Sequence, residues 1–136
     1  MSVLKRLSTV VLDCADPVAL AAFYQKATGW EITSSRPDFA SVGNGTPVQM
    51  AFVRVEGYRA PGRPGGAGQA HLDFTVTDLN GAAEELVGIG ASRPEAQPGE
   101  GEWIVLTDPE GHPFCSSPTP PPPRWATDRP ADKETD

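Results

Sequence analysis

The chain has 136 residues, of which 38% are hydrophobic, and its formal net charge is −7. This length predicts a single domain with its own core, and the acidic balance argues against nucleic acid, whose phosphates would be repelled. No apolar run approaches the roughly 20 residues that a membrane helix needs, and the start lacks a signal-peptide pattern. We therefore expect a cytoplasmic protein without a membrane partner, whose two cysteines are thiols.

The first predicted module covers residues 3–55 and opens with a strand in the alternating stretch LSTVVLDC. Asp16 is a good helix N-cap and Pro17 suits the first helical position. The segment PVALAAFYQKATG carries apolar residues at helical spacing and ends on Gly29. The strand candidates after it are WEITSS, FASVGN and VQMAFVRV, so the order of elements is βαβββ.

A stretch rich in glycine and proline, residues 56–70, predicts a long mobile connection. The same order of elements then recurs over residues 71–117. The strand AHLDFTVT leads to Asp78 as N-cap and to the helix LNGAAEELVGIG, and the strand candidates that follow are ASRPE, EWIVLTD and PFCSS. His71 matches Thr9 at an offset of 71 − 9 = 62 residues. The recurrence predicts a duplicated βαβββ module.

The end of the chain, residues 118–136, is too rich in proline for a helix or a sheet. It predicts a disordered tail beyond a domain that covers residues 1–117. The tail holds three basic and four acidic residues, so the rest of the chain keeps a charge of −7 + 1 = −6. Because a proline run can also bind an aromatic groove, an interaction module that uses this tail remains one alternative.

The stretches TVVLDCADPVALAAFYQKATGWE, HLDFTVTDLNGAAEEL and WIVLTDPEGHPFC resemble the vicinal oxygen chelate superfamily, and especially its actinobacterial glyoxalase-like branch. The superfamily includes glyoxalase I, extradiol dioxygenases and bleomycin resistance proteins. With the strands between them, these stretches cover most of residues 3–117. The resemblance implies an α+β fold in which two tandem βαβββ modules form a cup-shaped mixed sheet, assembled as a homodimer.

The resemblance also implies metal-ligand positions on the first and last strands of each module. They fall on Thr9, His71 and Cys115 and, when GTPVQ is aligned with GHPFC, on Gln49. Threonine is a poor ligand for a divalent metal and an amide oxygen is a weak one, so His71 and Cys115 are one short of a three-ligand catalytic site. We expect no metal cofactor; a divalent metal at His71 is the alternative.

Alternation along the strands extends the candidate site. If His71 and Thr9 face the cup, Asp73 and Asp13 face it too, and their neighbours in sequence pack under the helices. Either aspartate could bind a cationic or hydrogen-bonding ligand, or supply a carboxylate to a displaced metal. Trp103 opens the strand EWIVLTD and is a candidate stacking surface at the mouth of the cup.

The leading hypothesis is a small-molecule-binding protein that sequesters or carries its ligand without a metal. Its expected binding residues are Thr9, Asp13, Gln49, His71, Asp73, Trp103 and Cys115. The alternative is a metal-dependent enzyme with a nonstandard site, either a lyase or isomerase of the glyoxalase kind or a dioxygenase. His112, in the DPEGHP turn, is expected to be solvated.

Overall fold

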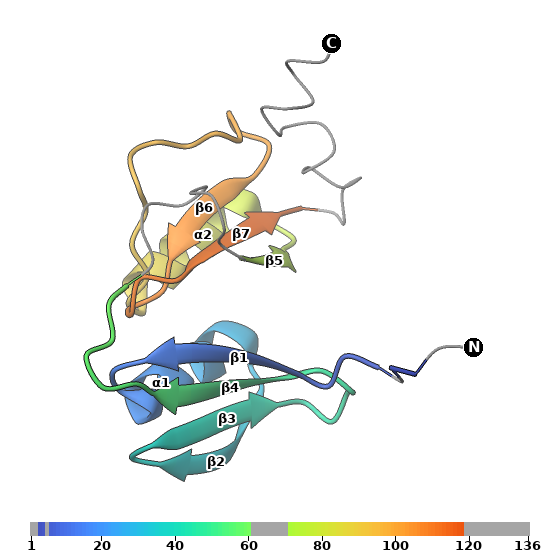
Figure 1. The fold of residues 1–136 in the computed structure, drawn as a ribbon. Helices are drawn as coiled ribbons and strands as arrows, with labels where there is room; N and C mark the ends of the chain where they lie inside the picture. The colour runs from blue at the N-terminus through green and yellow to red at the C-terminus, as the bar shows by residue number, and fades with distance from the viewer. Residues whose placement is uncertain (1–2, 5, 61–70, 119–136) are drawn as a thin grey trace.

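The computed structural model describes residues 3–4, 6–60 and 71–118. Residues 61–70 of the expected mobile connection (56–70) and residues 119–136 of the expected tail (118–136) lie outside this range. Two small sheets follow one another along the chain, and each is backed by one helix (Figure 1). In that view both helices lie behind the strands, so the helix-free faces of the two sheets are on the same side of the molecule.

The first sheet and its helix form module one. Its elements are β1 (Thr9–Cys14), α1 (Pro17–Thr28), β2 (Glu31–Arg36), β3 (Phe39–Gly43) and β4 (Gln49–Arg54). The strand order is β1-β4-β3-β2, with β1 and β4 parallel and the other pairs antiparallel. The predicted caps hold: the Asp16 carboxylate accepts a hydrogen bond from Ala19 N at 3.2 Å, and Gly29 ends the helix at φ 76°, a conformation that suits glycine.

The second sheet repeats this arrangement in module two. Its elements are β5 (Leu72–Thr75), α2 (Leu79–Gly88), β6 (Ile104–Thr107) and β7 (Pro113–Ser117). The strand order is β5-β7-β6, with β5 and β7 parallel and β6 antiparallel to β7. Asp78 caps α2 by accepting from Gly81 N, as Asp16 caps α1. The duplication expected from the sequence is therefore present, within a mixed α+β fold.

One predicted strand of module two is missing. The segment ASRPE makes only an isolated bridge between Ser92 and Thr107, because Pro94 has no N–H to continue a ladder. The free edge of β6 is paired by a side chain instead. The Gln97 amide donates to Val105 O and accepts from Val105 N, both at 2.9 Å. The second sheet is thus narrower than the first.

The core joins the two modules through α1. Tyr24 stacks on Phe52 of module one at 5.4 Å between ring centroids, while Phe23 lies 6.4 Å from Phe114 of module two. Phe114 in turn meets Phe74 edge-to-face at 5.7 Å. Aromatic residues from one helix therefore pack against both sheets, and the two modules share one core.

Candidate functional site

The predicted alternation of the first strands is confirmed. His71, just before β5, is exposed, as are Asp73 and Thr75 on the strand, while Leu72 and Phe74 are partly buried against the core under the helices. The helix-free side of the two sheets is called the open face here. It is the only face on which the expected polar residues of β5 are accessible, so a site that uses them lies there.

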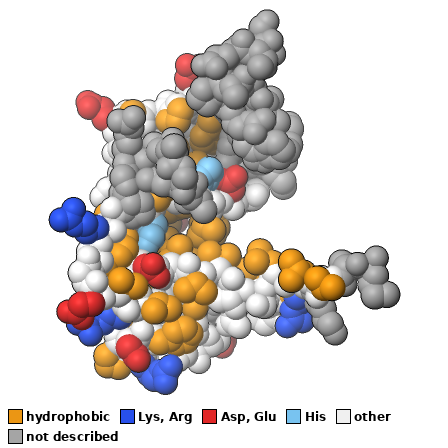
Figure 2. Space-filling view, viewed as in Figure 1, with side chains coloured by type: hydrophobic (Ala, Val, Ile, Leu, Met, Phe, Trp, Pro, Cys, Tyr) orange, Lys and Arg blue, Asp and Glu red, His pale blue; other side chains and the backbone are white. Residues whose placement is uncertain are grey.

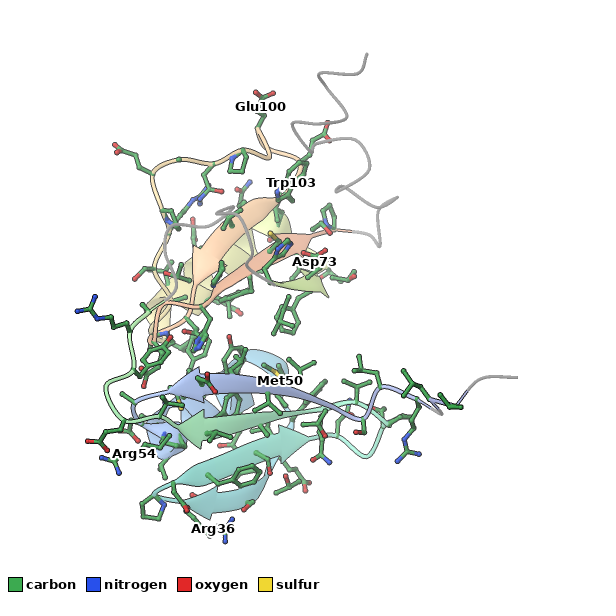
Figure 3. The ribbon with its side chains drawn as sticks, viewed as in Figure 1. Arg36, Met50, Arg54, Asp73, Glu100 and Trp103 are labelled. Atoms are coloured by element: carbon green, nitrogen blue, oxygen red, sulfur yellow. The ribbon has the colours of Figure 1, made fainter. Side chains whose placement is uncertain are left out.

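Three of the expected residues meet on the open face of module two. His71 Nε2 lies 3.3 Å from Asp73 Oδ1, and ligand-type atoms of His71, Asp73 and Cys115 all lie within 4.8 Å of one another. The pairing of β5 with β7 produces this cluster, because Asp73 and Cys115 are register partners. The side chains of His71 and Asp73 are about half exposed and Cys115 is buried. We call these three residues the polar trio. Of the three, Asp73 is labelled in Figure 3.

Module one does not carry an equivalent trio. Thr9 and Gln49 are register partners at the start of β1 and β4, and Asp13 lies exposed near the other end of β1. The structure therefore brings the expected residues together as one pair and one trio, with Asp13 apart from the pair along its strand.

The observed register corrects the expected alignment of Gln49 with Cys115. The helix caps give an offset of 78 − 16 = 62 between modules, so Asp73 corresponds to Val11. Val11 pairs with Ala51, just as Asp73 pairs with Cys115. The counterpart of Cys115 is therefore Ala51, two residues beyond Gln49. A shift of two residues along the strand keeps the side chain on the same face of the sheet. It does, however, put the methyl group of Ala51 where the weak amide ligand of Gln49 was expected.

Trp103 lies just before β6, away from the trio along the sheet (Figure 3). Its ring packs on the loop that precedes it: a methyl group at Gly99 would come within 2.7 Å of a ring carbon. This close approach requires a glycine. The ring is half-buried, so its contact with a ligand stays a prediction.

His112 overturns the expectation that it is solvated, since only 8% of the residue is exposed. Its Nδ1 lies 2.8 Å from the buried Asp108 carboxylate, and its Nε2 lies 2.7 Å from the carbonyl oxygen of Asp13. Tyr24 donates to the same carboxylate at 2.7 Å. Tyr58, whose hydroxyl donates to Glu110 O at 2.9 Å, lies 3.1 Å from Nε2. Both ring nitrogens thus face acceptors.

The electrostatics of His112 follow from these contacts. Burial alone would lower its pKa, but the hydrogen bond and the charge of Asp108 outweigh burial, so the pKa is raised above its ordinary value. The imidazolium form satisfies both acceptors at once. For Tyr24 the direction is also upward, because burial and then Asp108 disfavour the phenolate.

The turn around His112 connects module two to module one. The Glu110 carboxylate accepts from the backbone N–H groups of Ala15 and Asp16, at 3.2 and 2.9 Å, just before α1. Together with His112 and Asp108, it forms a group that we call the clamp. A signal for the clamp was present in the sequence, namely three ionisable side chains in DPEGH. The sequence did not indicate the distant partners of these side chains, because only the packing of the two modules brings them together.

The cysteines behave as expected in one respect, since both are buried thiols. Cys14 donates to Val53 O at 3.6 Å, and burial, followed by the charge of Glu110, raises its pKa to about 11. A thiol with such a pKa is protonated at neutral pH and is therefore a poor nucleophile. Among the described residues, no helix is long and apolar enough to cross a membrane.

Two curved, helix-backed sheets with a polar cluster on the open face define a protein of the glyoxalase and bleomycin resistance fold class. The family described as the glyoxalase-like domain matches residues 9–117. The chain belongs to this family, within the vicinal oxygen chelate superfamily. The resemblance to the superfamily seen in the sequence is therefore confirmed, and its actinobacterial branch stays a prediction.

Solved structures show the same fold. A glyoxalase-related enzyme from Fulvimarina pelagi is 24% identical, with 84% of this chain and 88% of that chain covered and a TM-score of 0.61. A glyoxalase/bleomycin resistance protein/dioxygenase family enzyme from Burkholderia phytofirmans PsJN is 23% identical, with coverages of 82% and 97% and a TM-score of 0.65.

A bleomycin-binding protein from Streptomyces verticillus, solved with copper(II)-bleomycin, is 21% identical, with coverages of 87% and 99% and a TM-score of 0.54. A comparison with curated proteins gives no match. At these identities the similarities show the fold alone, and the chemistry has to be argued from the site.

Proposed function

We propose that the protein binds a small molecule on its open face, and that it sequesters or carries this molecule without a resident metal. The observation that supports this most is the asymmetry of the two modules. The polar trio of module two corresponds to Thr9, Val11 and Ala51 in module one. Val and Ala offer no ligand atom and threonine is a poor ligand, so module one supplies no good metal ligand at the positions that correspond to the trio.

The same asymmetry suits a ligand with one polar end. The Val11 side chain is accessible, at 55% exposed, and hydrophobic side chains are spread over module one on the viewed side of the molecule (Figure 2). The trio supplies hydrogen-bonding groups and a half-exposed carboxylate, on a chain with a net charge of −7. An acidic surface of this kind favours a neutral or cationic ligand.

A second candidate is a metal-dependent enzyme, and the trio itself favours it. Among the metal positions expected from the sequence, only His71 and Cys115 are good ligands. In the structure Asp73 joins them, and the ligand atoms of all three residues lie within 4.8 Å of one another. The separation of 3.3 Å between His71 Nε2 and Asp73 Oδ1 is close to the edge of a tetrahedral zinc site, about 3.3 Å for ligands at 2.0–2.1 Å. The trio therefore fits a borderline divalent metal, which would polarise a substrate oxygen there.

Titration of metal-stripped protein with zinc, nickel, manganese and iron(II) by calorimetry separates the two candidates. If the proposed function is right, the wild type gives no more heat than His71→Ala. An Asp38→Ala variant, which removes an exposed carboxylate outside the trio, controls for weak surface binding. A thermal-shift screen with cationic and neutral amphipathic molecules then identifies the ligand class, and Val11→Asp should abolish the shift.

Micromolar binding of about one metal per chain, lost in His71→Ala and kept in Asp38→Ala, would reject the metal-independent proposal. It would support the enzyme instead. A Cys115→Ser variant would then distinguish zinc and nickel, which prefer the thiolate, from manganese, which does not.

A further inference from the structure

A pocket of about 230 Å³ lies on the side of the sheets opposite the open face. It is bounded by the end of α1, by α2, by the helix-facing residues of β5 and β7, and by Thr75 and Val76 at the end of β5. Module one contributes Tyr24 and Trp30, and module two contributes Phe74 and Phe114. The pocket is therefore formed only when α1 packs against the second sheet.

The lining of this pocket contains an unusual polar group. Ser116 lines the pocket and is completely buried, and within the described part of the chain its hydroxyl has no hydrogen-bond partner. A buried hydroxyl without a partner is destabilising. The hydroxyl of Thr28, which also lines the pocket, is already used, since it donates to Tyr24 O at 2.6 Å and accepts from Trp30 N at 3.0 Å. The Ser116 hydroxyl thus has no competing partner, and a ligand group can pair with it when the side chain rotates toward the pocket.

We propose that this pocket binds a small neutral aromatic molecule that carries one hydroxyl or carbonyl group, and that Ser116 hydrogen-bonds to this group. The aromatic rings of the lining favour a ring in edge-to-face contact. The described residues that line the pocket carry no charged side chain, so an ionised ligand would lose its hydration without compensation. The volume exceeds a cavity of about 150 Å³ that holds benzene, and it leaves room for one substituted ring.

The size of the pocket and its position separate it from the site on the open face. A drug-sized ligand occupies a pocket of roughly 300–1,000 Å³, so this pocket takes a smaller molecule. The Phe74 and Ser116 side chains point away from those of Asp73 and Cys115 because successive residues of a strand alternate. The proposal is therefore independent of what binds the polar trio.

The test is a titration of the full chain with p-cresol, followed by NMR of side-chain methyl groups. We expect the methyl signals of Ala27, Val76 and Leu86 to shift with a dissociation constant below about 1 mM, while the Val11 methyl groups on the open face do not move. Toluene, which lacks the hydroxyl, should bind about fivefold more weakly. The anion 4-methylbenzoate should bind at least about tenfold more weakly.

Two variants make the test specific. Ser116→Ala should weaken p-cresol about fivefold and leave toluene unchanged, with a melting temperature no lower than that of the wild type. Ala27→Leu should fill the pocket and abolish binding, whereas Ala19→Leu, on the exposed side of the same helix, should bind normally. If p-cresol binds Ser116→Ala as tightly as the wild type, or shifts only open-face methyl groups, the proposal is wrong.

Discussion

At the scale of the residue, His112 shows how a polar side chain can look like a catalytic group and serve the fold. A histidine between a buried carboxylate and a tyrosine resembles an acid–base pair. Here, however, Nε2 faces the backbone carbonyl of Asp13 at 2.7 Å and the residue is buried. Both nitrogens are therefore occupied by contacts that join the modules, and the polar trio remains the candidate for chemistry.

The raised pKa of His112 predicts how stability depends on pH. The native state binds the proton more tightly than the unfolded chain, whose histidine titrates near 6.5. The stabilisation is complete below that pH and is lost as the pH rises through the folded-state pKa. Urea denaturation at a series of pH values should show this decline in the wild type and a flatter profile in His112→Gln.

The other histidine of the chain supplies the control. His71→Gln removes a half-exposed imidazole from the polar trio and leaves the clamp intact. If the decline disappears in His71→Gln but persists in His112→Gln, the assignment to the clamp is wrong.

At the scale of the element, the edge of β6 is the least regular part of the fold. A side-chain amide replaces a neighbouring strand there, with Gln97 bonded to both backbone groups of Val105 and to Pro94 O. An unpaired edge would present open N–H and C=O groups to other chains. The Gln97 side chain thus completes a sheet that lacks its fourth strand.

Replacing this amide should loosen β6 locally. We expect Gln97→Leu, which cannot hydrogen-bond, to lower the free energy of unfolding by about 1–3 kcal/mol, because buried backbone groups lose their partner. Hydrogen exchange of the Val105 amide should accelerate by a larger factor than exchange in β3. In the matched variant Gln97→Glu, the carboxylate can still accept from Val105 N, and we expect slower exchange than in Gln97→Leu. Unchanged protection of Val105 in Gln97→Leu would refute this role.

At the scale of the whole molecule, two modules behave as one folding unit because α1 belongs to the cores of both. The rings of Phe23 and Tyr24 each lie 6.4 Å from the ring of Phe114, and the clamp adds polar contacts between the modules. The pocket beside Ser116 exists only at this junction. The expected homodimer and cytoplasmic location stay predictions.

Shared packing predicts that damage in module two destabilises module one. Phe114→Ala should cost about 3–5 kcal/mol, and the protection of Val42 in β3 against hydrogen exchange should fall by the same free energy. Phe39→Ala, which removes a half-buried ring stacked under Arg36, should cost less. If Val42 keeps its protection in Phe114→Ala, the modules unfold independently.

Local features of the sequence were sufficient for the elements of the fold. The caps at Asp16 and Asp78, the apolar spacing of the helices and the period-two strands depend on neighbouring residues, and these predictions are confirmed. The same alternation predicted which side chains of β5 face away from the helices. The missing strand at ASRPE shows the limit, because pairing of an edge strand depends on what lies beside it.

Long-range contacts decided the rest. The identity of the residue opposite Cys115 depends on strand register, and a slip of two residues leaves the apolar pattern unchanged. The addition of Asp73 to the trio and the burial of His112 depend on partners far away in sequence. The sequence by itself determined the duplication, the family and every element except the strand expected at ASRPE. Only the tertiary structure decided which polar residues meet, because side chains from separate strands and modules come together through packing rather than through local order.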